Sequence, residues 1–206
     1  MKTDSIFYRI FQQYPRSFFE LLNRPPSKAD SYQFTSVEIK QLAFRLDGVL
    51  LPTIEDENQP FYWVEVQFQP DETLYYRIFA ELFLYLRQYL LINPWRVVVI
   101  YPNRSVERLQ ASQFQEMLDL NRVTRIYLDE LEDTEDALGV QIIKLIIEPP
   151  ERAITTAQRL ITQAQETLPT APIQRDIIEL IETIVIYKLP QASREEIANM
   201  CQYVRN

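Results

Sequence analysis

Two carboxylates, Asp47 and Glu65, lie on either side of a polar loop in a stretch rich in apolar residues. Opposite positions on paired strands bring Cβ atoms to about 5 Å, and like charges placed there repel. A divalent cation bound between the two groups would remove this repulsion, because hard cations take oxygen ligands. The pair therefore suggests a metal site. The alternative is that both groups point to solvent from the wet face of a half-buried hairpin.

The register of a single hairpin decides whether these two carboxylates meet. Residues 44–69 contain two apolar-rich runs around a polar loop with a proline at each end, a pattern that predicts strand, loop and strand. A hairpin that is symmetric about Asp56 pairs Asp47 with Glu65. The other expected pairs are Val49 with Trp63 and Arg45 with Gln67 on the same face, and Leu50 with Tyr62, Leu46 with Val66 and Phe44 with Phe68 on the opposite face.

The composition removes several classes of chemistry. The chain of 206 residues contains no histidine, so Ser-His-Asp and Cys-His catalysis and histidine-based zinc sites are excluded. Its two glycines cannot form a phosphate-binding loop or a dinucleotide fingerprint, and its one cysteine cannot form an intramolecular disulfide. An enzyme with this composition must therefore use carboxylates, Lys, Arg, Tyr, Ser or Thr together with a bound metal.

The net charge of −8 argues against a general affinity for nucleic acid, which usually requires a basic surface. The acidity is concentrated in residues 129–206, where 14 Asp and Glu accompany 7 Lys and Arg, so residues 1–128 can still present a local basic patch. No apolar run approaches the roughly 20 residues that span a bilayer, and the N-terminus lacks the pattern of a signal peptide. We therefore expect a cytoplasmic protein without a membrane partner.

Helices and buried strands must hold the hairpin in place. Apolar residues at helical spacing predict helical structure within residues 4–22 and a helix within residues 70–91. Residues 95–101 (WRVVVIY) form an apolar run apart from Arg96, which is typical of a strand buried on both faces. A right-handed crossover would make this strand parallel to the second hairpin strand. The expected fold is α/β with a mixed sheet. Further predicted elements are a loop at 27–34, strands at 36–40 and 123–128, and helices at 135–147, 151–167, 173–188 and 193–204.

Four stretches together resemble a known nuclease family. They are residues 4–22, residues 45–50 (RLDGVL), Glu65-Val66-Gln67 and residues 138–149. Their order is similar to that of the PD-(D/E)xK nuclease core, and more narrowly to the recombination-promoting nuclease (Rpn) and transposase-related family in its cyanobacterial-type branch. The resemblance covers nearly the whole chain. It implies a PD-(D/E)xK restriction-endonuclease-like core at residues 1–130, a C-terminal helical region at 131–206, and the activity of a metal-dependent DNA endonuclease.

The resemblance also assigns roles to residues. It implies that Asp47 and Glu65 bind Mg²⁺, or Mn²⁺ in its place, with the carbonyl of Val66 as a further ligand. Gln67 stands where the family motif has lysine, so it would orient the attacking water without lysine's positive charge. Lys40, on the predicted strand at 36–40, or Arg77 would then supply this charge, and a solvent-facing position is the alternative for Lys40.

Three further residues are expected near this site. Glu20, on the first helix, would join the metal site as an acid does in similar nucleases, and a solvated helix position is the alternative. Arg77 and Tyr76 follow the hairpin closely enough to line its mouth, and a guanidinium matches the oxygens of a phosphate in a fork. A salt bridge between Arg77 and Glu81 is the alternative for this arginine.

Two features leave the function and the assembly open. Gln67 and the negative charge both favour a catalytically weak or inactive nuclease-fold protein. Such an accessory factor would bind DNA, or would bind a protein through its acidic C-terminal helices. The apolar segment at 177–186 needs burial, either within its own chain or in a homodimer.

Overall fold

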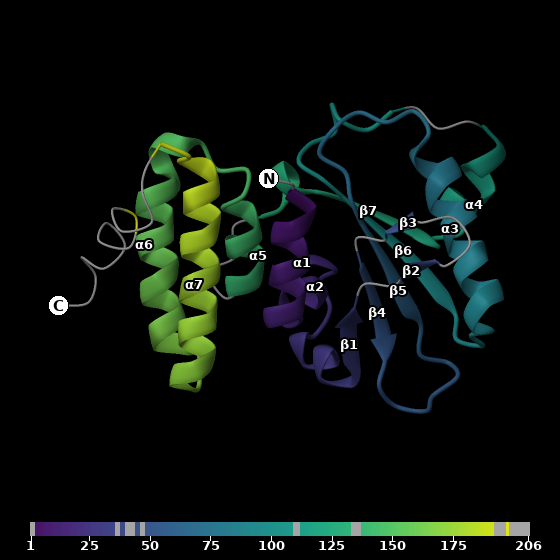
Figure 1. Ribbon diagram of the computed structural model, residues 1–206, viewed down its shortest axis with the longest axis horizontal. Coiled ribbons are helices and arrows are strands. Elements are labelled where there is room, and N and C mark those ends of the chain that lie inside the picture. The colour runs from purple at the N-terminus through teal and green to yellow at the C-terminus, as the bar shows by residue number, and fades with distance from the viewer. Residues whose placement is uncertain are drawn as a thin grey trace. The chain divides into compact units, whose positions relative to one another are not determined.

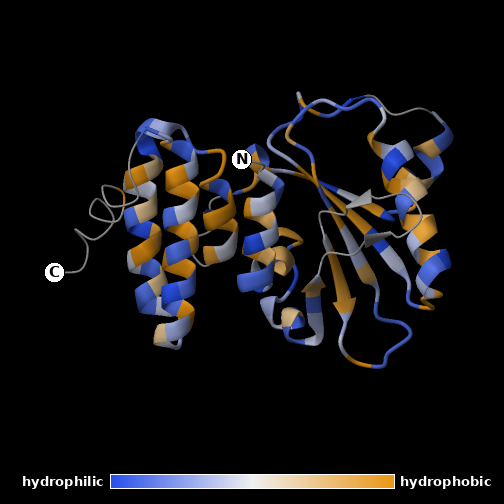
Figure 2. Ribbon diagram, viewed as in Figure 1, coloured by the Kyte–Doolittle hydropathy of each residue, from blue (hydrophilic) through white to orange (hydrophobic). Residues whose placement is uncertain are grey.

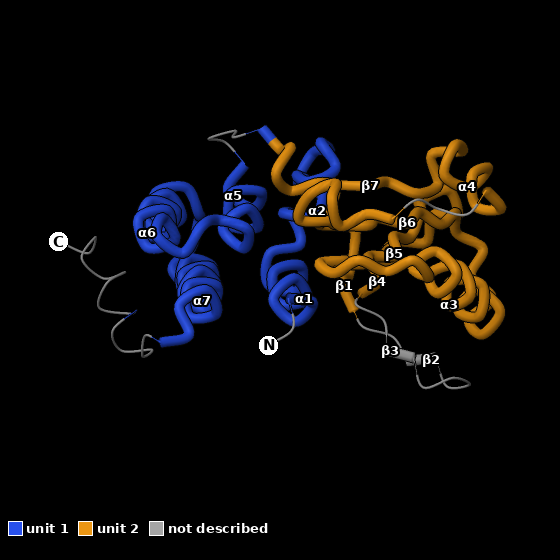
Figure 3. Tube along the Cα trace, turned by 90° about the horizontal axis from the view of Figure 1, so that it is seen from above, with its two compact units in different colours: residues 1–27, 132–206 blue, residues 28–131 orange. Residues whose placement is uncertain are grey.

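The computed structural model describes residues 3–35, 38–39, 44–45, 48–108, 112–132, 137–191 and 197. The chain forms two compact units (Figures 1 and 3): unit 1 comprises residues 1–27 and 132–206, and unit 2 comprises residues 28–131. The boundary expected after residue 130 nearly coincides with the end of unit 2. Residues 1–27, however, group with the C-terminal helices and not with the sheet.

Unit 2 is built on a five-stranded mixed sheet with the strand order β1-β4-β5-β6-β7. The hairpin strands β4 (Gly48–Pro52) and β5 (Phe61–Val66) are antiparallel, and β1 (Tyr32–Thr35) is antiparallel to β4. Strands β6 (Trp95–Tyr101) and β7 (Val123–Tyr127) continue the sheet in parallel from β5, which confirms the predicted parallel pairing of β6 with the second hairpin strand. Strand β1 replaces the end of the expected loop at 27–34, after a 3₁₀ helix at Pro26–Ser31.

A second, two-stranded sheet pairs β2 (Glu38–Ile39) with β3 (Phe44–Arg45) in antiparallel register. The expected strand at 36–40 therefore has a described part at Glu38–Ile39, and its remaining residues lie outside the described part of the chain. Strand β2 lies against α3 (Leu74–Tyr89), the helix that connects β5 to β6.

Helix α3 covers one face of the large sheet because its apolar stripe matches the alternation of the strands. Leu74, Ile78 and Leu82 of α3 belong to one buried cluster with side chains from β4, β5, β6 and β7. Figure 2 shows the apolar colouring along these strands. A 3₁₀ helix at Ser112–Phe114, the short helix α4 (Gln115–Asp119) and a 3₁₀ helix at Leu128–Glu130 complete unit 2.

Where β4 and β5 pair, the hairpin register is the one expected from symmetry about Asp56. Gly48 pairs with Val64, Val49 with Trp63, and Leu50 with Tyr62. The expected pairs of Phe44 with Phe68 and of Arg45 with Gln67 are wrong, because Phe44 and Arg45 pair with Ile39 and Glu38 in the second sheet. The solvated alternative for this hairpin face is wrong, because every residue of β5 is buried and Val49 and Trp63 are fully buried. The face that carries Glu65 is therefore covered by α3 and is not wet.

Unit 1 contains the helices α1 (Thr3–Gln13), α2 (Arg16–Leu21), α5 (Leu138–Lys144), α6 (Pro150–Thr167) and α7 (Ala171–Lys188). Helices α6 and α7 pack against each other, α1 packs on α7, and α2 packs on α5. The α2–α5 contact depends on Gly139, since a Cβ there would lie 2.6 Å from the Cα of Ser17. No helix within the described residues is long and apolar enough to cross a membrane.

The apolar segment at 177–186 is buried on α7 within this chain, and its buried side chains include Ile177, Ile181 and Ile184. Of the helix expected at 193–204, only Ile197 is described, and it is helical and buried. The expected helices at 135–147, 151–167 and 173–188 correspond to α5, α6 and α7.

Candidate functional site

Glu65 is a buried carboxylate near the C-terminal end of β5. Strand alternation places it on the same face as Trp63, which α3 covers, and only 3% of the residue is exposed. An ionised group in such a place is costly unless it has charged or hydrogen-bonding partners. The arrangement around Glu65 therefore decides what chemistry it can perform.

Arg77, in the first turn of α3, is the charged partner of Glu65. Its Nη1 lies 2.7 Å from Oε1 of Glu65, and its Nη2 lies 3.5 Å from Oδ2 of Asp71. Asp71 is itself fixed, because its carboxylate accepts hydrogen bonds from the backbone N–H of Thr73 at 2.8 Å and from the hydroxyl of Thr73 at 2.7 Å. One guanidinium thus joins a buried acid of the sheet to an acid at the start of the helix.

A third acid, Glu81, lies one turn further along α3 and is also buried, with 3% of the residue exposed. Burial lowers the pKa of Arg77, but the charges of Glu65, Glu81 and Asp71 raise it by more. The pKa of Asp71 is lowered, because the hydrogen bonds of Thr73 and the charge of Arg77 outweigh the effect of burial. Glu81 was expected, with Tyr76 and Arg77, to lie near the mouth of the hairpin and to be an alternative ion-pair partner of Arg77. In the sequence, Glu81 lies directly before Leu82, beside the apolar stripe formed by positions 74, 78, 82 and 85. This position on the helix is the local pattern that could have indicated its burial.

The structure places the other predicted residues of the β5 motif beside Glu65. Val66 is buried and pairs with Ile100 of β6. Gln67 is 9% exposed, and its backbone N–H donates to the carbonyl of Ile100 at 2.9 Å. The side-chain amide of Gln67 donates to the carbonyl of Gln69, so the group that stands at the motif lysine is held by a local backbone acceptor.

Tyr76 lies on the outer side of α3, with about half of the residue exposed. Its hydroxyl accepts a hydrogen bond from the side-chain amide of Gln113, and its ring contacts Phe114 at 4.8 Å between centroids. Tyr76 is therefore accessible to a ligand, whereas the neighbouring Arg77 is committed to two carboxylates.

Asp47 and Lys40, the remaining predicted members of the site in unit 2, lie outside the described residues. The register of β4 and β5 runs up to Gly48, one residue from Asp47. Within the described ranges, no group of three or more acidic, cysteine or histidine residues is arranged to hold a metal ion. The donor chemistry at Glu65 still fits a hard divalent cation, since buried carboxylate oxygens are the ligands that such ions take.

Glu20 belongs to unit 1, and its contacts there are those of a helix cap. Its Oε2 accepts a hydrogen bond from the backbone N–H of Val140 at 3.2 Å, in the first turn of α5. The hydroxyl of Tyr14 lies 3.5 Å from Oε1. Burial raises the pKa of Glu20, and the hydrogen bonds from Val140, Gly139 and Tyr14 offset this only in part. Glu20 is half-buried, so it is not the freely solvated position given as the alternative.

A second polar cluster lies at the C-terminal ends of β6 and β7. Glu107 accepts hydrogen bonds from Arg125 at 3.0 Å and from the hydroxyl of Tyr127. The hydroxyls of Tyr75 and Tyr101 are buried nearby in the α3-covered core, where they lie close to each other. Burial is the main cause that raises the pKa of both tyrosines. Both side chains are buried in this core.

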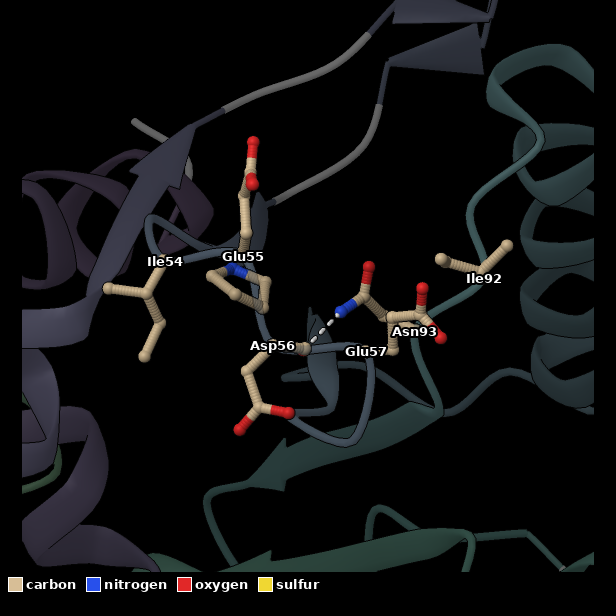
Figure 4. Close-up of a pocket in the computed structure, with 7 residues that line it drawn as sticks. Ile54, Glu55, Asp56, Glu57, Ile92 and Asn93 are labelled. Atoms are coloured by element: carbon tan, nitrogen blue, oxygen red, sulfur yellow. Dashed lines mark hydrogen bonds between the residues drawn. The ribbon is translucent and has the colours of Figure 1, made fainter.

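A surface pocket lies at the opposite end of β5, beside the loop that precedes Phe61. Asn93 donates to the backbone carbonyl of Asp56 at 3.0 Å and to that of Gln59 at 3.1 Å, which ties this loop to the segment before β6 (Figure 4). Glu55, Asp56 and Glu57 line the pocket, and Figure 4 shows their carboxylates pointing in different directions. They do not converge on a common ligand position.

Comparisons with known proteins give one match. No curated protein and no solved structure is significantly similar to the chain. A protein-family model with the description "Protein of unknown function (DUF2887)" matches residues 3–201. This match extends over both units, from α1 to the last described helical residue. The chain therefore belongs to the DUF2887 family.

Proposed function

We propose that this protein is a metal-dependent DNA endonuclease of the recombination-promoting nuclease type, built on a PD-(D/E)xK-like α/β core. Asp47 and Glu65 would hold a Mg²⁺ ion, with the carbonyl of Val66 as a further ligand and Mn²⁺ as a substitute. Mg²⁺ keeps several waters and needs only one or two protein carboxylates, so this donor set is sufficient. Bound there, the ion lowers the pKa of water and neutralises charge on the scissile phosphate.

The other side chains act on the substrate in this proposal. Gln67 orients the attacking water through its amide. Arg77, with Lys40, supplies the positive charge that the motif lysine would supply, and it binds a phosphate oxygen of the DNA. Tyr76 is exposed at the start of α3 and contacts the sugar–phosphate backbone.

One observation carries the proposal: the pairing of Val49 with Trp63. A hairpin that continues in this register for one more pair on the same face brings Asp47 opposite Glu65. Glu65 is buried on that face, where a carboxylate requires a cationic partner.

A plasmid-nicking assay tests the proposal. Supercoiled plasmid is incubated with wild type, Asp47→Ala, Glu65→Ala and the control Glu57→Ala, each with Mg²⁺, with Mn²⁺ and with EDTA. We expect metal-dependent nicking by wild type and by the loop control, and a loss of about 100-fold or more in the two site variants. Nicking that persists in both site variants would discard the site.

The second candidate is a nuclease-fold accessory protein that binds without cleaving. Two contacts favour it: Arg77 already neutralises Glu65, and the amide of Gln67 is engaged by the carbonyl of Gln69. Unit 2 also contains 10 Lys and Arg against 15 Asp and Glu, a net charge of −5, which weakens binding to phosphates. Fluorescence anisotropy with labelled duplex DNA separates the cases. Binding without nicking under any metal would support a DNA-binding accessory factor, and the absence of both would leave a protein partner of the acidic helices.

A further inference from the structure

The ion pair between Arg77 and Glu65 occupies the carboxylate that the proposed metal ion needs. Nη1 of Arg77 lies 2.7 Å from Oε1 of Glu65, a distance at which the guanidinium makes a charge-assisted hydrogen bond. A divalent cation that approaches the same carboxylate meets a positive charge already in place. Like charges at a few ångströms repel strongly in a partly buried site.

The two partners differ in their freedom to move. The side chain of Glu65 is 4% exposed and belongs to a central strand, so it is fixed. The side chain of Arg77 is 36% exposed and stands on the first turn of a helix. If one partner leaves the pair when a metal binds, that partner is Arg77.

Two further carboxylates lie close to Arg77, one before α3 and one on it. Oδ2 of Asp71 is already 3.5 Å from Nη2 of Arg77, and Thr73 fixes Asp71 through two hydrogen bonds. Glu81 lies four residues along α3 from Arg77, on the same side of the helix. A small rotation of the arginine side chain therefore exchanges one carboxylate for another without leaving the charge unpaired.

We propose that Arg77 is a built-in cation that competes with the divalent metal for Glu65, and that Asp71 and Glu81 hold its guanidinium once the metal is bound. This inference rests on the metal site of the proposed function. It gives the protein a metal-free state in which Glu65 is neutralised, and it sets the metal concentration at which the site fills. In the metal-bound state Asp71 and Glu81 hold one side of the guanidinium, and its remaining N–H donors are those that bind the phosphate of the proposed function.

Mn²⁺ binding measured by electron paramagnetic resonance of the free ion tests this competition without any need for cleavage. The proteins are wild type, Arg77→Gln, Glu65→Gln and the matched control Arg125→Gln, which removes another ion-paired arginine of unit 2 and changes the charge equally. We expect Arg77→Gln to bind Mn²⁺ about tenfold more tightly than wild type. The control should bind like wild type, and Glu65→Gln should lose binding.

A thermodynamic cycle with Asp71 keeps the test decisive if Arg77→Gln folds poorly. Asp71→Asn removes the acceptor for the displaced guanidinium, so it should weaken Mn²⁺ binding by about threefold to tenfold. The same substitution should have little effect when Arg77 is already Gln. Circular dichroism and a thermal melt of each variant, with and without Mn²⁺, show which proteins are folded, and metal should raise the melting temperature of Arg77→Gln more than that of wild type.

The outcomes separate this inference from the proposed function. Equal Mn²⁺ affinity in wild type and Arg77→Gln overturns the competition and leaves the metal site standing. Tighter binding by Arg77→Gln supports the competition even if no variant nicks plasmid, in which case the nuclease proposal alone fails. Absence of Mn²⁺ binding in every variant overturns both.

Discussion

Glu20 of α2 and Val140 of α5 are joined by a hydrogen bond across 120 positions of the sequence, from the backbone N–H of Val140 to Oε2 of Glu20. Gly139 lies next to this bond, where a Cβ would be 2.6 Å from the same carboxylate oxygen. A carboxylate at this position accepts from N–H groups that the first turn of a helix leaves without intrahelical partners. The contact ties the N-terminal helices of unit 1 to its C-terminal helices.

This contact predicts the effect of removing the Glu20 side chain. Glu20→Ala leaves the first turn of α5 without its acceptor and should lower the free energy of unfolding by about 1–2 kcal/mol. Glu20→Gln keeps an acceptor oxygen and should cost less than half as much.

Urea unfolding followed by far-UV circular dichroism measures this loss of stability, because both tryptophans, Trp63 and Trp95, lie in unit 2 and do not report on unit 1. The exposed Glu166→Ala on α6 is the control and should change stability by less than about 0.5 kcal/mol. An equal loss in the Ala and Gln variants would contradict the capping role.

The raised pKa of Glu20 predicts a pH dependence of the same unit. Burial raises this pKa above its usual value of 4.5, so the folded protein holds the proton at a pH where the unfolded chain has released it. The contribution of Glu20 to stability is therefore largest at and below pH 4.5 and falls as the pH rises through the folded pKa. Glu20→Gln cannot titrate. The stability of wild type relative to Glu20→Gln should accordingly decrease between pH 4.5 and pH 7, as measured by urea unfolding in dilute protein. If the difference in unfolding free energy between wild type and Glu20→Gln stays constant across this range, folding does not favour the protonated form of Glu20 over the ionised form, and the prediction is wrong.

Much of unit 2 was predictable because its signals are local. Two prolines bracket the hairpin loop, apolar residues continue on either side, and this symmetry predicted the pairing of Val49 with Trp63. The apolar run at 95–101, in which Arg96 is the one charged residue, predicted the buried strand β6. Periods of 2 and 3.6 residues are properties of neighbouring positions, so sequence alone can reveal them.

The remaining features depend on contacts between distant residues. Strand β1 has only four residues and directly follows a proline-rich turn, so its pairing with β4 has no local signal. The packing of α2 against α5 is likewise not indicated by any pattern of neighbouring residues. The contact of Arg77 with Glu65 requires the crossover to return α3 over the sheet at one particular position. The expected salt bridge between Arg77 and Glu81 rested on their i,i+4 spacing within one helix, which gives no information about contacts with the sheet.

Gly48 predicts a packing effect close to the candidate site. A Cβ on Gly48 would lie 2.1 Å from Cζ of Phe34, a buried side chain of β1, so Ala cannot fit unless that ring moves. Gly48→Ala should lower the stability of unit 2 by about 1–3 kcal/mol, measured by urea unfolding with tryptophan fluorescence. Phe34→Leu shortens the obstructing side chain. It should therefore reduce the cost of Gly48→Ala in the double variant, and strictly additive costs would contradict the predicted clash.

Gln67→Lys tests whether the motif position limits the proposed chemistry. The backbone N–H of Gln67 is fixed by the carbonyl of Ile100, so the strand presents residue 67 in the same place whichever side chain it carries. Lysine there would lose the contact with the carbonyl of Gln69 and would bring a positive charge beside Glu65. A charge that stabilises the transition state more than the ground state raises the rate constant, so nicking with saturating Mg²⁺ should increase by about tenfold or more. Gln67→Met has a similar length without the charge and should not increase the rate. If Lys and Met variants nick equally, the missing charge at residue 67 is not what limits the enzyme.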